Sequence, residues 1–272
     1  LSGNARHDLL VPANRHHYIA RLSTDVDILL NSPPCETHTR VRHSASPGPP
    51  PVRDATWPRG LPGLDEAQQL AVDNANVLGD FAIKCLHVAG DNGVLAALEF
   101  PEDLGRTAKG IPASWWQDAE MRRLDSKSFV RGAIYQSEWG KVPYLKPTGL
   151  MTNAAALYND PQFYQGWPQF DARKRYLGPL PPRKAAPVAL VGKKPDGSFV
   201  TGPTASFPPA MCMRLAGHLF QAWVQRQLGA NTVGTLHREP AAAASAPARP
   251  AQPPPSALES QVAPSVPTPP LP

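Results

Sequence analysis

The stretch Val26–Cys35 reads VDILLNSPPC, a short apolar run that ends in two prolines and a cysteine. Its central part, residues 27–32, is Leu-rich and partly β-branched, a composition typical of a buried parallel strand. The two prolines donate no backbone hydrogen bond, so they end the strand and stiffen the turn that follows. The sequence therefore predicts a strand over residues 27–32 with Cys35 held at its end.

Cys35 has two interpretations. A lone cysteine is most often a small buried hydrophobic residue. The loop that follows it, Glu36–Arg42, reads ETHTRVR and is polar and basic, and positive charge stabilises a thiolate relative to the thiol. Since the thiolate is the reacting form, we expect Cys35 to be a nucleophile whose thiolate is favoured by this loop.

A helix and a second strand follow along the chain. Between residues 64 and 88 apolar residues recur at helical spacing, and Gly90 is available to end the helix. Residues 94–98 form another apolar run. A strand, a helix and a strand make a βαβ unit, which predicts a parallel sheet with helices on its faces. Cys85, on the inner face of this helix, is expected to lie in the core.

The second half of the chain is expected to extend this sheet. Further strands are predicted near residues 129–135 and 149–152, and a last helix over about 208–228 carries an apolar stripe that we interpret as a packing face. Cys212 in this helix is expected to pack in the same way as Cys85. Residues 154–184 are expected to be irregular.

Two motifs together resemble the DNA cytosine-5-methyltransferases. The strand with Asp27, followed by Pro33-Pro34-Cys35, is similar to the motif that carries the nucleophile of that family. Downstream, the run Gly93–Pro101 reads GVLAALEFP, which resembles the Glu-Asn-Val or Glu-Asn-Pro motif, with Phe100 in place of the asparagine. The resemblance implies that Cys35 and Glu99 are the catalytic pair.

Three weaker matches follow in the family's order. Tyr135–Gly140 reads YQSEWG and Lys146–Asn153 reads KPTGLMTN, similar to the Gln-x-x-Gly and Lys-Pro-Thr to Thr-Asn segments of phage-type or mobile-element members. Ser206–Cys212, SFPPAMC, resembles the start of the last helix. The resemblance covers about residues 25–223.

The same resemblance implies a set of substrate-binding residues, namely Pro34, Arg40, Gln136 and Lys146. In the functional interpretation Gln136 and Lys146 contact phosphate or the target base, and in the alternative they are solvated surface groups. The loop after the cysteine closes over the target base in this family. Arg53, Trp57 and Arg59 are therefore expected to pack against nucleic acid, unless the proline-rich stretch 44–62 is only a stiffened surface loop.

The chemistry of the pair supports this interpretation. Attack on carbon 6 of a cytosine needs a soft nucleophile and a partner that protonates ring nitrogen 3, and burial would raise the pKa of Glu99 toward its protonated form. Addition of the Cys35 thiolate makes carbon 5 nucleophilic, and carbon 5 then takes the methyl group of S-adenosylmethionine. In a duplex the base must be flipped into the site. The implied partner is DNA, and RNA would suit the same thiol chemistry.

The cofactor loop of such an enzyme is missing from the sequence. In the resembling family a Gly-rich S-adenosylmethionine loop precedes the cysteine, whereas only 34 residues precede Cys35 and a βαβ unit takes roughly 30 or more. The chain also begins with Leu1. We therefore expect an N-terminally truncated chain, completed by a missing N-terminal half or by a partner chain.

The expected fold is α/β: an incomplete Rossmann-like sheet of the S-adenosylmethionine-dependent methyltransferase type, with flanking helices. Residues 1–24 are interpreted as a remnant of a preceding segment and residues 25–230 as the catalytic domain. Residues 231–272 contain many of the 34 prolines and are expected to be disordered, because their composition lacks the apolar residues that would offset the entropy of ordering.

Charge and cysteine usage narrow the functional class. The 27 Lys and Arg against 22 Asp and Glu give a net charge of +5, which suits a nucleic-acid partner without proving one. The run Arg173–Arg175 suits phosphate contacts or solubility equally well. Three cysteines in unrelated settings and no Cys-x-x-Cys support neither a metal site nor a disulfide framework. No apolar run spans a membrane, so we expect an intracellular protein, nuclear in a eukaryote.

Three functions therefore stay open. The first is methylation of cytosine in DNA through a Cys35 adduct. The second is a catalytically inactive relic, or a nucleic-acid-binding part of a mobile-element polyprotein, which Phe100 and the missing cofactor loop favour. The third is an unrelated thiol enzyme that uses Cys35 with His38, three residues away in the same loop.

Overall fold

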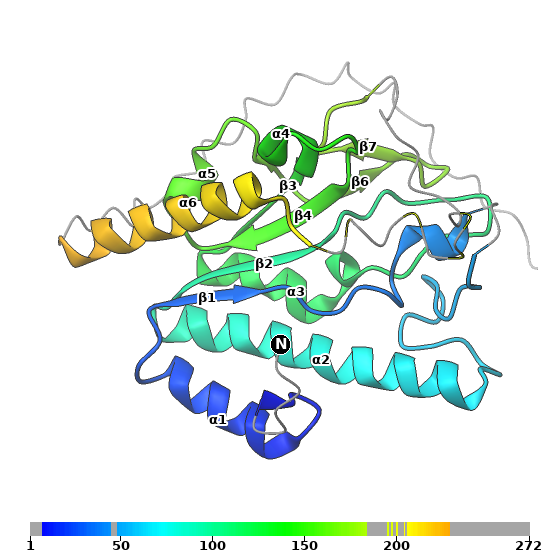
Figure 1. The fold of residues 1–272 in the computed structure, drawn as a ribbon, viewed down its shortest axis with the longest axis horizontal. Helices are drawn as coiled ribbons and strands as arrows, with labels where there is room; N and C mark the ends of the chain where they lie inside the picture. The colour runs from blue at the N-terminus through cyan, green and yellow to red at the C-terminus, as the bar shows by residue number, and fades with distance from the viewer. Residues whose placement is uncertain are drawn as a thin grey trace, which may run out of the picture. The chain divides into compact units, whose positions relative to one another are not determined.

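The structure is a computed structural model that describes residues 7–44, 48–183 and 206–228, together with positions 195, 197, 200 and 204. Within this part of the chain, helices lie on both faces of a five-stranded sheet (Figure 1). The fold is therefore α/β, as the sequence predicts. The predicted tail, residues 231–272, lies outside the described residues.

The main sheet has the strand order β1-β2-β4-β3-β5. β1 is parallel to β2, whereas β4 is antiparallel to both β2 and β3, and β5 is antiparallel to β3. A separate pair, β6 and β7, is antiparallel. The strands are β1 Ile28–Asn31, β2 Leu95–Pro101, β3 Val130–Tyr135, β4 Pro147–Thr152, β5 Tyr164–Gln165, β6 Gln169–Phe170 and β7 Tyr176–Gly178. The sheet is mixed, so the prediction of a parallel sheet is right only for the β1-β2 pair.

Six α-helices and three 3-10 segments are assigned within the described residues. The α-helices are α1 Pro12–Leu22, α2 Glu66–Asp91, α3 Ala119–Arg123, α4 Gln136–Gly140, α5 Ala155–Tyr158 and α6 Pro209–Gln227. The 3-10 segments are η2 Arg40–His43, η3 Trp115–Gln117 and η4 Leu124–Lys127. The predicted irregular stretch 154–184 thus holds α5 and three short strands, and is less irregular than expected.

The predicted βαβ unit is formed by β1, α2 and β2. Helix α2 begins with a capping box, in which the Asp65 carboxylate accepts from the Gln68 backbone N–H at 2.8 Å. The prediction that Gly90 ends the helix is wrong, because α2 continues to Asp91 and turns into β2 through Gly93. Gly93 has φ of +67°, a left-handed conformation that glycine adopts without a steric penalty.

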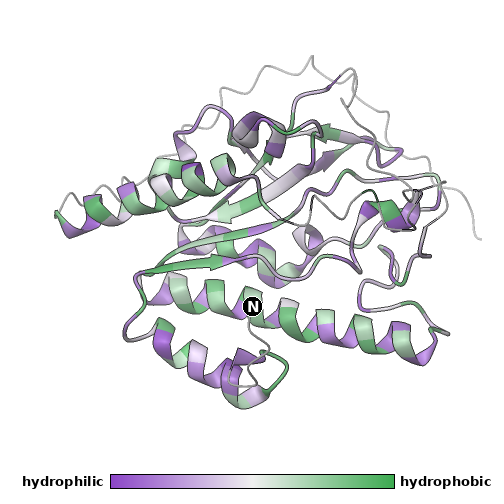
Figure 2. Ribbon diagram, in the orientation of Figure 1, coloured by the Kyte–Doolittle hydropathy of each residue, from purple (hydrophilic) through white to green (hydrophobic). Residues whose placement is uncertain are grey.

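The two faces of the sheet pack against different helices. Along β2, Ala96, Leu98 and Phe100 pack into the cluster with α2, whereas Leu95 and Ala97 pack into the cluster with α6. This alternation is the two-residue period of a strand, and it places Glu99 on the α6 face. Figure 2 shows mostly apolar residues on β1 and alternating apolar and polar positions along α2 and α6. Both long helices are thus amphipathic covers of the sheet.

Three smaller findings complete the fold. Helix α1 packs against α2 and buries Leu22 in the same cluster. Cys85 is buried as predicted, but Cys212 is exposed, because it lies on the outer side of α6 beside the buried Met211. In the part of the chain that the structure describes, every helix is too short or too polar to cross a membrane.

Candidate active site

Cys35 and Glu99 both lie at the carboxyl ends of the parallel pair β1 and β2. The register places Asn31 beside Leu98, so the next residue of the first segment, Ser32, comes beside Glu99. The Ser32 hydroxyl donates to a carboxylate oxygen of Glu99 at 2.9 Å. The Pro33-Pro34 turn then leads to Cys35, whose free thiol is half-buried. Residues 64 positions apart in the chain are thereby brought to one edge of the sheet.

Glu99 is buried, with 7% of its surface exposed. Burial raises the pKa of its carboxyl group, and this effect exceeds the opposite effects of the Ser32 hydrogen bond and the Lys146 charge. The carboxyl group is therefore biased toward its protonated form, the direction that the sequence analysis expected. A protonated Glu99 is a hydrogen-bond donor, which an ionised one is not.

Lys146 brings a positive charge to the same place from the connection that precedes β4. Its ammonium donates to the Thr204 backbone carbonyl at 2.5 Å and lies 5.7 Å from the centre of the Phe207 ring. From there its charge lowers the pKa of both Cys35 and Glu99. The structure thus brings together three of the predicted site residues, Cys35, Glu99 and Lys146.

The prediction that the basic loop favours the Cys35 thiolate is wrong. Burial and the Glu99 carboxylate raise the pKa of Cys35, and among the nearby charges Lys146 alone is a cation that lowers it. Arg40 points elsewhere, donating to the backbone carbonyls of Gly105 and Arg106 at 2.6 and 2.9 Å. The guanidinium therefore anchors a loop and does not face the thiol.

The other two predicted substrate-binding residues differ in their surroundings. Pro34 is exposed directly before Cys35, where it forms part of the stiff turn. Gln136 is fully buried, and its amide donates to the Thr148 hydroxyl at 3.1 Å. The Gln136 side-chain oxygen has no hydrogen-bond partner among the described residues. Because Thr148 is two residues from Lys146, the hydrogen bond between the amide and the hydroxyl ties Gln136 of α4 to the segment that carries Lys146.

His38 does not form a catalytic pair with Cys35. Its Nε2 accepts from the Arg53 guanidinium at 3.1 Å and its Nδ1 lies 3.3 Å from the Thr37 hydroxyl, so both ring nitrogens are engaged. Burial, followed by the Arg53 charge, lowers the pKa of His38 to about 2. A histidine with this pKa is a poor proton acceptor at neutral pH, which argues against the third function considered from the sequence.

The predicted nucleic-acid contacts of the 44–62 loop are corrected in part. Arg53 is 1% exposed and donates to the Pro58 and Val72 carbonyls and to the Asn76 amide oxygen, so it holds the loop on α2. Arg59 pairs with Asp80 at 2.5 Å on the surface. Trp57 is exposed, with half of its surface open to solvent. Positions 45–47 lie outside the described residues.

Phe100 occupies the opposite face of the sheet from Glu99. Its ring stacks on Trp115, with 4.6 Å between ring centres and an angle of 1° between the planes. The His38 ring meets both aromatic rings edge-on. In this position Phe100 is a core residue of the cluster between β2 and α2. Cys35 packs against this same cluster, whereas Glu99 faces α6.

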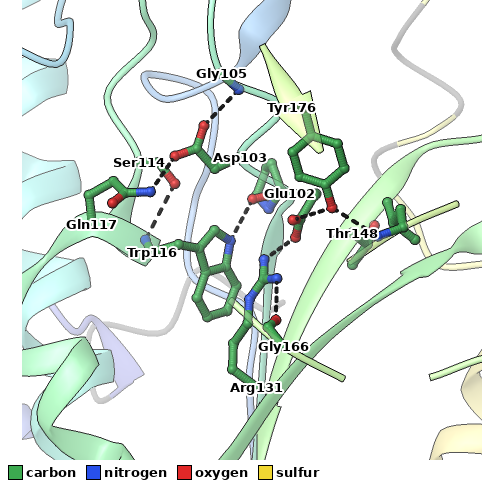
Figure 3. A network of polar contacts seen from close by, with 12 residues as sticks. Glu102, Asp103, Gly105, Ser114, Trp116, Gln117, Arg131, Thr148, Gly166 and Tyr176 are labelled. Atoms are coloured by element: carbon green, nitrogen blue, oxygen red, sulfur yellow. Dashed lines mark hydrogen bonds and ion pairs between the residues drawn. The ribbon is translucent and has the colours of Figure 1, made fainter. Parts of the chain in front are cut away.

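A buried polar network holds the segment that follows β2. Glu102 and Arg131 form a fully buried ion pair, and the Tyr176 hydroxyl donates to the second Glu102 oxygen at 2.8 Å (Figure 3). The Trp116 indole donates to the Pro101 carbonyl at 2.8 Å, beneath the Arg131 guanidinium. These contacts join the end of β2 to β3 and β7 directly beyond Glu99.

Sequence reasoning missed two parts of this site. The sequence indicates Ser32 only as the end of the strand. Its hydroxyl, directly before Pro-Pro-Cys, is the local signal that could have indicated the hydrogen bond to Glu99. Glu102 and Arg131 gave no signal, because their 29-residue separation becomes a contact only through the order of the strands. Comparison of the chain with known protein families, with curated proteins and with solved structures found no match.

Proposed function

We propose that the chain carries the nucleophile of a cytosine-5-methyltransferase-type reaction on nucleic acid, with DNA as substrate. The observation that supports this most is that Cys35, Glu99 and Lys146 lie within electrostatic reach of one another, a thiol near a carboxyl group of raised pKa and one cation. A soft nucleophile next to a proton donor is what addition to a pyrimidine ring needs.

The chemical steps follow from these groups. The Cys35 thiolate forms a bond to carbon 6 of cytosine, and the electrons of the carbon 5–carbon 6 double bond move through the ring toward nitrogen 3. Protonated Glu99 supplies the proton to nitrogen 3, giving an enamine whose carbon 5 is nucleophilic. Carbon 5 takes an electrophile, then loses its original hydrogen as a proton, and the thiolate leaves as the double bond reforms.

Lys146 has a supporting role in this scheme. The Cys35 pKa is raised, so the thiolate is a minority form at neutral pH, and the nearby ammonium lowers the cost of forming it. Bound to the Thr204 carbonyl, the ammonium stays near the thiol without having to contact it. Its charge also suits a substrate phosphate.

The described residues do not fit the methyl donor of this family, S-adenosylmethionine. Two cavities of the described residues have walls that include neither Cys35 nor Glu99, and no Gly-rich loop precedes β1 in the sequence. Addition and proton transfer are therefore the steps that these residues account for. Within the described residues β1 pairs only with β2, so it is an edge strand of the sheet.

Hydrogen exchange at carbon 5 tests the proposal without a methyl donor. When the enamine takes a proton from water in place of a methyl group, a deuterium at carbon 5 is replaced by hydrogen. We expect the protein to accelerate loss of deuterium from a single-stranded DNA oligonucleotide with 5-deuterocytosine, measured by mass spectrometry. The variant Cys35→Ser should abolish the acceleration, and Cys212→Ser, which changes an exposed thiol of α6, should not.

Exchange no faster than in buffer would contradict the proposal and favour the second candidate, an inactive nucleic-acid-binding protein. The raised pKa of Cys35 is the observation that supports this second function, because a protonated thiol is a weak nucleophile. Acceleration that persists in Cys35→Ser would also contradict the proposed role of the thiol.

A further inference from the structure

A cavity lies beside the Cys35 loop. It has a volume of about 440 Å³, within the range of small-ligand sites, and His38 of that loop is part of its wall. The ring of Phe170 supplies aromatic surface, the buried Trp115 indole contributes only its edge, and Ser114 and Gln117 supply hydrogen-bonding groups. The function proposed above uses none of these residues.

A basic turn forms the rim of this cavity. Lys174, in the connection between β6 and β7, lines the cavity and is exposed, and the neighbouring Arg173 and Arg106 are exposed as well. Two hydrogen bonds join the segments: the Arg106 backbone N–H donates to the Lys174 carbonyl at 2.9 Å and its side chain donates to the Arg173 carbonyl at 3.1 Å. The three cations are thus displayed on a fixed piece of backbone.

These cations are not neutralised locally. Over the described ranges, no carboxylate is within ion-pair distance of Arg106, Arg173 or Lys174, although Arg175 in the same turn pairs with Asp171 at 2.6 Å. Arg40 links the turn to the Cys35 loop through the Gly105 and Arg106 carbonyls. The basic rim and the thiol therefore belong to one connected part of the surface.

The charges inside the cavity have the opposite sign. Asp103 is a buried carboxylate that accepts from the Gly105 backbone N–H at 2.9 Å and from the Gln117 side-chain amide at 2.8 Å (Figure 3). Asp118 also lines the wall. An acidic peptide side chain would meet these carboxylates and be repelled. A ligand with an anionic exterior and a neutral, planar, hydrogen-bonding interior would satisfy both regions. A nucleotide in a strand has this distribution of charge.

We propose that this cavity and its basic rim bind an unpaired nucleotide of the nucleic-acid substrate, next to the nucleotide that reacts at Cys35. The base enters the cavity, where aromatic and amide groups contact it, and the adjoining phosphates lie on Lys174, Arg173 and Arg106. Aromatic surface combined with a positively charged groove is the common arrangement of single-strand binding sites. The assignment of a neighbouring reacting nucleotide rests on the proposed function, whereas the binding itself does not.

Fluorescence anisotropy with a labelled single-stranded DNA of about 12 nucleotides tests the proposal. We expect Lys174→Glu to weaken binding about tenfold and to make it less dependent on salt, since one phosphate contact is lost and a repulsion is added. The matched control is Lys84→Glu, which makes the same charge change at an exposed position of α2 outside the cavity wall. It should bind like the wild type.

The cavity itself is tested by filling it. Ala119 and Ala55 line the cavity and are exposed, so tryptophan at either position fills it without entering the core. We expect Ala119→Trp and Ala55→Trp each to weaken single-strand binding several-fold, and duplex DNA to bind the wild type more weakly than the single strand. Wild-type affinity in Lys174→Glu or in both tryptophan variants, equal binding of the duplex, or equal competition by polyglutamate would overturn the proposal.

This test is independent of the proposed chemistry. It needs no methyl donor, and Cys35→Ser should bind the strand like the wild type. Intact binding without carbon 5 exchange would remove the proposed reaction and leave the binding site standing. Carbon 5 exchange that does not depend on Lys174 or on the cavity would remove the proposed binding site and leave the proposed reaction standing.

Discussion

Two charged side chains act on the Cys35 thiol in opposite directions. The Glu99 carboxylate raises the pKa of the thiol when it is ionised, and the Lys146 ammonium lowers it. In the proposed reaction, protonation of Glu99 would supply the proton that a cytosine ring needs, and it would also remove the negative charge that raises the Cys35 pKa. The proposed reactive form is a Cys35 thiolate near a protonated Glu99, and the Lys146 charge favours that thiolate.

Alkylation of Cys35 by iodoacetamide measures this coupling. Glu99→Gln should lower the Cys35 pKa and speed alkylation several-fold, most clearly at alkaline pH where the wild-type carboxylate is ionised. Lys146→Met should raise the pKa and slow alkylation several-fold. Peptide mass spectrometry over a pH series gives the rates, with the exposed Cys212 as internal reference. Equal Cys35 rates in all three proteins would mean that neither charge acts on the thiol.

Helix α2 and the segment η3 pack in close contact at Gly79. A Cβ atom on Gly79 would lie 1.8 Å from a Trp115 ring carbon, so only a glycine permits this approach. The other side of the Trp115 ring stacks on Phe100 of β2. One indole thus spaces the helix from the strand that carries Glu99, and the same indole lines the cavity.

Gly79→Ala should therefore destabilise the protein, although the same change in a helix interior normally adds up to about 1 kcal/mol of stability. We expect a net loss of about 1 to 3 kcal/mol in the free energy of unfolding, because the Trp115 ring must move in a packed core. The matched control is Gly217→Ala on the exposed side of α6, where a Cβ meets nothing within 4 Å, and it should stabilise. Urea denaturation compares the two, and a stabilised Gly79→Ala would contradict this packing.

For the molecule as a whole, one buried group links the loop after Cys35 to the long helix. Arg53 donates to His38 of the loop and to the Asn76 side chain and Val72 carbonyl of α2. His38 accepts this bond only in its neutral form. The folded protein therefore depends on an uncharged imidazole next to a buried cation.

Acid should weaken the fold through this histidine. The His38 pKa is about 2 in the folded protein against an ordinary 6.5, so unfolding takes up a proton between these values and the unfolded state is favoured as pH falls. One such proton contributes about 1.4 kcal/mol per pH unit. In the variant His38→Gln, the free energy of unfolding should fall less steeply below pH 6, by about this much per pH unit. Urea denaturation at several pH values measures this slope. An unchanged slope would mean that His38 is not buried neutral.

How much of the molecule was predictable depends on the range of the interactions. β1, α2, β2 and α6 follow from apolar periodicity and from proline positions, which are local signals. The insertion of β4 between β2 and β3 was not predictable, because it depends on pairing between strands about fifty residues apart.

The residues of the candidate site also divide into those that local sequence signals indicate and those that depend on long-range contacts. Cys35 and Glu99 stand at ends of recognisable runs, so their meeting follows once the strands are parallel. Arg40 and Arg53 look alike in the sequence, as basic residues of one loop, yet both donate to backbone carbonyls, and Arg53 is buried. Side-chain direction in an irregular loop is set by distant carbonyl groups, and residue type alone does not indicate it.

Covalent trapping tests the central claim most directly. A ring nitrogen at position 5 makes carbon 6 more electron-poor than in cytosine, so a thiol adds there more readily and the adduct accumulates. We expect incubation with single-stranded DNA containing 5-azacytosine to give a protein–DNA adduct, with peptide mapping placing it on Cys35. Glu99→Gln should reduce the yield, and the exposed Cys212 should remain unmodified. No adduct from a folded protein, or an adduct on Cys212 in equal yield, would contradict the account.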